Sequence, residues 1–186
     1  MIAEEKNPDR TAREAALRAL VRFEQDRAYL NLVLPSLVGG LPAAERSLAR
    51  ELAAGTVQRL NTVDWALQLH LKHPLEKLTP WIRNLLRLSA YQLLYLDRVP
   101  DYAAVDQAVH LARRFGHRGV ADLVNAVLRN LARDNDVLPW PDRCRKPAEY
   151  LSLKESHPRW LVERALKRWG FFETEAWCLA NNRKPA

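Results

Sequence analysis

The sequence has little glycine and no long alternation of apolar and polar residues. Only 6 of its 186 residues are glycine, and both features argue against a protein built from sheets. No apolar run reaches the roughly 18 residues that mark a membrane-spanning helix. The first residues include Glu4 and Glu5 and no apolar segment, so we expect no secretory signal. Hydrophobic residues make up 48% of the chain, enough to bury a core.

Cysteine is also scarce. The two cysteines, Cys144 and Cys178, have no second cysteine or histidine at ligand spacing, so they predict neither a zinc site nor a disulfide framework. This usage fits a reducing compartment, and we expect a cytoplasmic protein. Cys144 lies between Arg143 and Arg145, a setting that lowers the pKa of a thiol; the alternative is an incidental cysteine in a charged loop.

The common catalytic motifs are missing. The sequence has no GxGxxG, P-loop, HExxH or GxSxG pattern. His70 and His73 have helical ligand spacing, but Pro74 follows directly and should end that helix. We therefore predict no catalytic residue, no cofactor site and no metal site within this chain.

The apolar residues recur at helical spacing, which predicts an all-α fold. The segment from Pro80 to Leu96 is apolar nearly all round in its second half, so we place it at the centre of a helical bundle. We interpret Gln92 within it as a core amide whose hydrogen bonds are satisfied. Proline or asparagine at the starts, such as Asn7 as cap and Pro8 as first residue of the first helix, and glycine at the ends set the other boundaries. The remaining predicted helices of the bundle are 8–26, 30–38, 42–71 with a kink near Gly55 or Asn61, 102–114 and 119–133.

The pattern changes after residue 133. Residues 134–156 contain three prolines and little periodicity, which predicts a linker or an ordered strap that Trp140 pins to the helices. Residues 157–186 contain two short helical segments separated by Gly170. This hairpin is too small to form its own core, and we interpret it as the start of another domain.

Arginine dominates the basic residues. There are 22 arginines among 29 basic residues, and the formal net charge is +7. Guanidinium groups match phosphate oxygens and stack on bases, which favours RNA; buried ion pairs and a GC-rich genome are the alternatives. We select two groups as RNA contacts, one on the first helix and one at a helix–helix junction: Arg10, Arg13, Arg18 and Arg22, and then Arg113, Arg114 and Arg118.

The two arginine groups differ in how easily ion pairing explains them. Glu14, Arg18 and Arg22 share one helix face, opposite the alanines and leucines. That face is either an arginine ridge for phosphates or a solvated surface with a Glu14–Arg18 pair. The Arg113–Arg118 group has no nearby acid before Asp122, so ion pairing explains it less well.

Several segments together resemble a known family. Residues 85–100, 103–112 and 124–130, with Glu51 to Arg59 before them, are similar to NusB-like domains, and the likeness covers residues 8–133. The segment from His157 to Gly170, followed by Asn181 and Asn182, resembles the joint between a NusB-like domain and the methylase in the Sun/Fmu (RsmB) family of rRNA cytosine-C5 methyltransferases.

The resemblance implies an RNA-binding and positioning domain of an enzyme that uses S-adenosylmethionine to methylate small-subunit ribosomal RNA. Neither Cys144 nor Cys178 matches the family's Pro-Cys and Thr-Cys motifs, so the catalytic domain would lie beyond residue 186 and this chain alone would be inactive. The implied partners are ribosomal RNA and the chain's own C-terminal catalytic domain. We also expect self-association through the aromatic residues of the hairpin, among them Trp160. The alternative function is a NusB-type antitermination or protein-interaction module.

Overall fold

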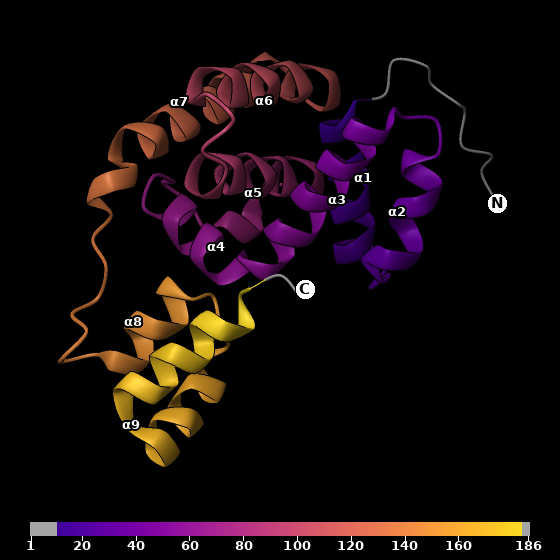
Figure 1. Cartoon of the computed structure of the whole chain (residues 1–186). Helices are drawn as coiled ribbons and strands as arrows, with labels where there is room; N and C mark the ends of the chain where they lie inside the picture. The colour runs from indigo at the N-terminus through magenta and orange to yellow at the C-terminus, as the bar shows by residue number, and fades with distance from the viewer. Residues whose placement is uncertain (1–10, 184–186) are drawn as a thin grey trace.

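The computed structural model describes residues 11–183, which form helices and no strand (Figure 1). The predicted all-α bundle is therefore confirmed. The helices, including two short 3-10 turns labelled η, are α1 (Ala12–Gln25), α2 (Leu30–Val38), α3 (Ala43–Gln58), α4 (Leu60–Gln68), η1 (Leu75–Lys77), α5 (Pro80–Tyr95), α6 (Asp101–Phe115), α7 (Arg118–Asp134), η2 (Asn135–Val137), α8 (Pro147–Lys154) and α9 (Arg159–Asn181). Among the described residues, no helix is both long enough and apolar enough to cross a bilayer.

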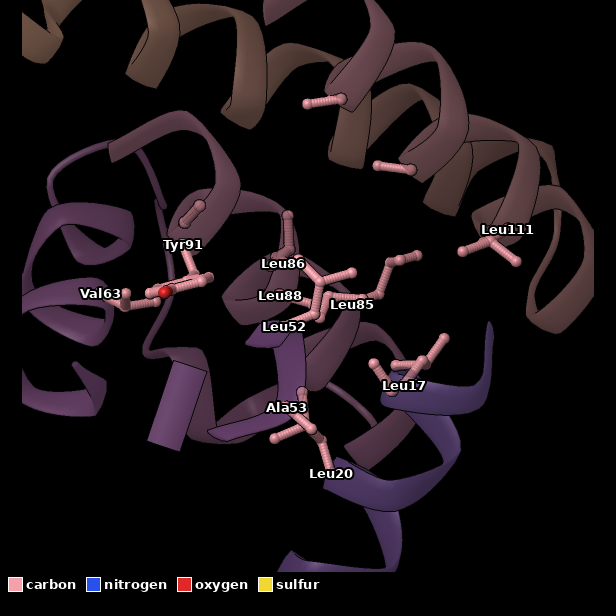
Figure 2. Packing of buried hydrophobic residues seen from close by; sticks show 14 of the residues in the cluster. Leu17, Leu20, Leu52, Ala53, Val63, Leu85, Leu86, Leu88, Tyr91 and Leu111 are labelled. Carbon is pink, nitrogen blue, oxygen red and sulfur yellow. The ribbon is translucent and has the colours of Figure 1, made fainter. Parts of the chain in front are cut away.

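Two helices, α1 and α5, form the centre of the bundle. α5 packs against α1, α3, α4, α6 and α7, as its apolar surface predicts. α1 packs against α2, α3 and α5, and none of its residues from 12 to 24 is exposed. Its alanines let the neighbouring helices approach closely. The core residues around these helices (Figure 2) include Leu17, Leu52, Val63, Leu86 and Leu111, each from a different helix.

The start of α1 differs from the sequence prediction. Asn7 and Pro8, the predicted cap and first helical residue, lie outside the described residues, and the helix begins at Ala12. Thr11 is its N-cap, because the Thr11 hydroxyl accepts a hydrogen bond from the backbone N–H of Glu14 at 3.2 Å.

The predicted helix over residues 42–71 is two helices, which meet at Arg59. Before this break, Gly55 allows α3 to lie directly against α5. A Cβ atom at Gly55 would come within 2.1 Å of the Tyr91 ring, so no other residue fits without movement of the ring. The Tyr91 hydroxyl donates to a Glu51 carboxylate oxygen at 2.9 Å.

Residues 135–183, which we call the tail, begin with a strap along the bundle and end in α8 and α9 below it (Figure 1). α8 packs on α9 and on α4, around a second apolar cluster of Leu151, Val162 and Cys178. α8 lies in the range predicted as a linker, and Pro147 at its first turn starts it. The predicted break at Gly170 is present: this residue has φ +76° and divides α9 into two halves.

The tail is fixed to α4 by polar contacts. The N-terminus of α4 receives no hydrogen bond from the side chain of its own N-cap residue. Instead, the Ser156 hydroxyl accepts from the backbone N–H groups of Asn61 at 3.1 Å and Thr62 at 3.4 Å. The Thr62 hydroxyl donates to the Leu153 carbonyl, and Trp140 stacks near Trp65 with ring centroids 4.5 Å apart. Trp140 therefore pins the strap to the bundle as predicted.

Candidate nucleic-acid interface

The first group of predicted RNA contacts does not form an exposed ridge. Arg10 lies outside the described residues, and Arg13, Arg18 and Arg22 are only half-exposed. Glu14, which was placed on the same outer face, is buried with 1% exposure. Arg13, Arg18 and Arg22 therefore form no exposed ridge, because the surrounding helices cover α1 on nearly all sides.

The Arg13 side chain makes a contact inside the bundle rather than on its surface. Its Nε atom donates a hydrogen bond to the side-chain oxygen of Gln92 at 2.9 Å, and the Gln92 amide donates to the Leu88 carbonyl at 3.1 Å. Burial lowers the pKa of the Arg13 guanidinium, and the negative charge of Glu45 offsets part of this effect. Gln92 is thus a satisfied core amide that ties α5 to α1, as the sequence indicated.

The two arginine groups meet at Glu14. One carboxylate oxygen accepts from Arg18 at 2.9 Å, and the other accepts from Arg114 at 2.6 Å. Ion pairing, which seemed from the sequence to explain the Arg113–Arg118 group less well, thus does account for Arg114. Its acidic partner lies 100 positions away in the sequence, where a search of neighbouring residues does not find it.

An aromatic pair completes this arrangement. The rings of Trp81 and Phe115 stack with centroids 4.5 Å apart, and the Arg18 guanidinium lies over both, at 5.7 Å and 5.6 Å. Arg114 lies over Phe115 at 5.7 Å. We call Glu14, Arg18, Trp81, Arg114 and Phe115 the Glu14 cluster. The cluster holds the end of α6 against α1 and α5, and it orients Arg114, which keeps 41% side-chain exposure.

The exposed cations lie beside this cluster, at the turn between α6 and α7. Arg113 lies in the last turn of α6, Arg118 begins α7, and both are exposed. With Arg114 they bring three arginines to the ends of one turn, and guanidinium groups are well suited to bind phosphate oxygens. We call Arg113, Arg114 and Arg118 the junction arginines.

A groove between α6 and α7 runs from the junction. It has a volume of about 460 Å³, and Arg113 and Arg129 share its lining with Asp101, Asp106 and Asp122. The aspartates would repel phosphates inside the groove. The turn itself is therefore the better phosphate site.

Two further arginines form ion pairs between helices in a second network. Glu24 at the end of α1 pairs with Arg83 and Arg87 of α5, and Arg87 also binds Asp64 of α4 at 2.7 Å. Burial by itself would raise the pKa of Glu24. Hydrogen bonds from Arg83 and Asn84 and the charges of Arg83 and Arg87 outweigh burial, so the pKa lies below its usual value. Ion pairing, the alternative explanation of the arginine content, thus holds for part of it.

The two cysteines have different environments. Cys144 is exposed, and its backbone N–H donates to the Asp142 carboxylate at 2.8 Å. Cys178 is buried in the tail, and burial, with the charges of Glu155 and Glu175, raises the pKa of its thiol to about 11. Cys178 is therefore a packing residue. The described residues gather no group of three His, Cys, Asp or Glu side chains that is suited to a metal ion.

The residues that position the junction arginines were not recognised from the sequence. Glu14 follows Thr11 by three residues, a capping-box spacing that predicts a local role for its carboxylate. Trp81 and Phe115 each look like ordinary apolar residues of a helix, since nothing in the sequence indicates that they stack.

Comparison with known proteins agrees with this fold of α1 to α7. Residues 10–133 match the NusB family. The chain resembles the solved structure of NusB from T. maritima, with a TM-score of 0.63 and 27% identity over 66% of this chain and 89% of that one. A structure of the antitermination factors NusB and NusE in complex with dsRNA has a TM-score of 0.61 at 21% identity, which shows the fold alone. The structure of PH0851 covers 92% of this chain, tail included, with a TM-score of 0.67 at 16% identity.

Curated relatives match beyond the bundle. The probable ribosomal RNA small subunit methyltransferase B of Bacillus subtilis is 39% identical over 170 residues, which are 90% of this chain and 37% of that protein. The corresponding protein of Synechocystis is 32% identical over 95% of this chain and 40% of its own length. The chain thus spans about two fifths of the length of these relatives.

These matches give the class of the protein: it is a NusB-type helical bundle followed by a helical tail. The chain belongs to the NusB family. Its relatives named small-subunit methyltransferase B confirm the resemblance to the NusB-like region of the Sun/Fmu (RsmB) family.

Proposed function

We propose that this chain is the RNA-binding and positioning part of a small-subunit rRNA (cytosine-C5) methyltransferase that uses S-adenosylmethionine. The observation that carries the proposal is the extent of the match to the Bacillus subtilis relative, which covers 90% of this chain. A match of that extent includes part of the tail, whereas T. maritima NusB covers only 66% of this chain.

In this proposal the junction arginines bind phosphates and set the position of the RNA. Phosphate contacts supply affinity and register but no sequence information. Arg114 is held by Glu14 and so loses less conformational freedom on binding than a mobile arginine would. Extrusion and methylation of the base belong to the rest of the longer protein.

The residues of this chain do not fit the cofactor. The described residues contain no strand, so they lack the strand–turn–helix that commonly holds a nucleotide-containing cofactor. We therefore derive no step through S-adenosylmethionine here, and we assign its site to the catalytic domain. That domain and ribosomal RNA are the proposed partners, in a cytoplasmic protein.

The first test measures binding of small-subunit rRNA fragments at increasing salt concentrations. We expect the affinity to fall steeply with salt, and the double variant Arg113→Glu/Arg118→Glu to lose at least about tenfold in affinity. The slope of log K against log salt should fall by about 0.7–0.9 for each phosphate that the variant no longer neutralises. The double variant Arg50→Glu/Arg98→Glu, which changes two exposed arginines away from the junction, is the charge-matched control. Affinity that does not depend on salt, or equal losses in both variants, would contradict the proposal.

The second candidate function is a protein-interaction or antitermination module. The complex of NusB with NusE and dsRNA favours it, since that NusB is seen with a protein and an RNA together. Alanine variants of the junction arginines, assayed separately for RNA and for protein binding, distinguish the two functions. Loss of protein binding with unchanged RNA binding would favour this alternative.

The tail has exposed aromatic side chains that also suit a protein contact. Trp169 is 45% exposed and Phe172 is 77% exposed, and both lie within two residues of Gly170. We propose that these two residues pack on the catalytic domain or, in its absence, on a second copy of the chain. A monomer in light scattering at high concentration would contradict self-association.

A further inference from the structure

The first half of α9 presents a tryptophan to solvent in a row with two cations. Trp160 is 65% exposed, whereas Val162 and Ala165 are buried against the rest of the tail. At 100° per residue, Trp160, Arg164 and Lys167 lie on successive turns of the opposite face, and Arg164 and Lys167 are both exposed. An aromatic ring and two positive charges therefore form one continuous strip.

The segment of the chain that contains this strip is positively charged. Residues 143–168 contain eight basic and three acidic residues, a formal charge of +5. Each of the three acids already has a basic partner within 4 Å: Glu149 pairs with Lys146, Glu155 with Arg59, and Glu163 with Arg159. Within the described part of the chain, no acid pairs with Arg164 or Lys167. Their charge is available for a ligand.

The chemistry of the strip favours RNA over a protein partner. A protein that buried Trp160 would also have to remove water from Arg164 and Lys167, at a cost that only well-placed acids would offset. RNA supplies a flat base for the indole and phosphates for the cations. In a double helix the bases are stacked inside and the indole cannot reach their faces, so the strip suits a single strand.

We propose that Trp160, Arg164 and Lys167 form a second RNA contact, specific for single-stranded RNA, in which a base stacks on Trp160 and the two cations bind the flanking phosphates. The inference extends the proposed function, since RNA is again the ligand, but it rests on different residues. α9 and the turn between α6 and α7 lie at opposite ends of the molecule (Figure 1). The two contacts should therefore respond to mutation independently.

The test measures binding of a labelled single-stranded oligouridine to the whole 186-residue chain by fluorescence anisotropy. Loss of one stacked base typically weakens binding by at least about fivefold, and we expect that loss for Trp160→Ala. Trp160→Phe should retain most of the affinity because a ring remains. Phe172→Ala is the matched control, since it removes another exposed aromatic residue of α9 without neighbours at positions 164 and 167. The double variant Arg164→Glu/Lys167→Glu should bind more weakly and show a smaller salt slope.

Three results would overturn the inference. The first is a chain that does not bind oligouridine at low salt, and the second is a Trp160→Ala variant with unchanged affinity or with the same loss as Phe172→Ala. The third is a Trp160→Ala variant that binds RNA normally but no longer self-associates, which would make the strip a protein contact. If Arg113→Glu/Arg118→Glu has no effect on rRNA fragments while Trp160→Ala weakens oligouridine binding, the junction site fails and the strip stands.

Discussion

Glu14 is a buried residue of α1, and its two carboxylate oxygens accept hydrogen bonds from different arginines. Arg18 and Arg114 come from helices far apart in the sequence, and both retain some exposure, 31% and 41%. Removing one partner of a buried ion pair leaves the other charges without compensation. At the residue scale, this carboxylate therefore determines the position of Arg114, which is one of the three junction arginines.

Glu14→Gln keeps the shape of the side chain and removes its charge. We expect the free energy of unfolding to fall by roughly 2–3 kcal/mol, less than a fully buried pair would lose because both arginines retain contact with water. Urea denaturation measures the change. Glu163→Gln is the control, because it breaks an exposed i,i+4 pair with Arg159 and should cost no more than about 1 kcal/mol. Equal effects of the two substitutions would contradict the role given to Glu14.

At the scale of elements, the packing of α3 on α5 depends on a glycine, and the N-terminus of α4 depends on a serine far away in the sequence. Gly55 leaves room for the Tyr91 ring. Ser156 caps α4 from nearly 100 residues further along the chain. The cap therefore makes the tail part of the stability of the bundle.

Ser156→Ala removes the acceptor for the two backbone N–H groups at the start of α4. Loss of an N-cap typically costs about 1 kcal/mol, and we expect that decrease in the free energy of unfolding. Ser156 also has φ +57°, a conformation that asparagine tolerates, so Ser156→Asn should retain most of the stability. Ser36→Ala, an exposed position in α2, serves as the control. A neutral Ser156→Ala would show that water caps α4 equally well.

At the scale of the whole molecule, Glu24 joins three helices: its carboxylate pairs with Arg83 and Arg87 of α5, and Arg87 continues to Asp64 of α4. Its pKa in the folded chain is below the usual value. The folded state therefore binds a proton at Glu24 less readily than the unfolded state does. The contribution of Glu24 to stability is fully present above the pKa of the unfolded chain, about 4.3, and is lost as the pH falls through the folded pKa.

The pH dependence of unfolding tests this account. Glu24→Gln should be less stable than the natural sequence at pH 7, and the difference between the two should shrink as the pH falls below about 4. Urea midpoints measured from neutral to acidic pH for both chains provide the comparison. A difference that stays constant over this range would mean that the charge of Glu24 does not stabilise the fold.

Much of the helix pattern was predictable because it is local. The apolar surface of the helix around Leu86, the break at Gly170 and the positions of Trp140 and Gln92 follow from periodicity and residue type. α8 was missed, since eight residues covered by α4 on one side and α9 on the other show no amphipathic period. The candidate site was less predictable, because Glu14 and Arg114 are far apart in sequence.

The helical class, the arginine excess and the family follow from the sequence alone, because periodicity, composition and the order of short segments are properties of neighbouring residues. Which arginines form internal contacts and which stay exposed was decided by the packing of the helices. Arg13 and Arg18 became internal contacts because helices packed over them, while Arg113 and Arg118 remain exposed because a turn between helices has no layer outside it. Whether an arginine is buried or exposed depends on which helices cover it, and this packing is set by contacts between residues far apart in the chain.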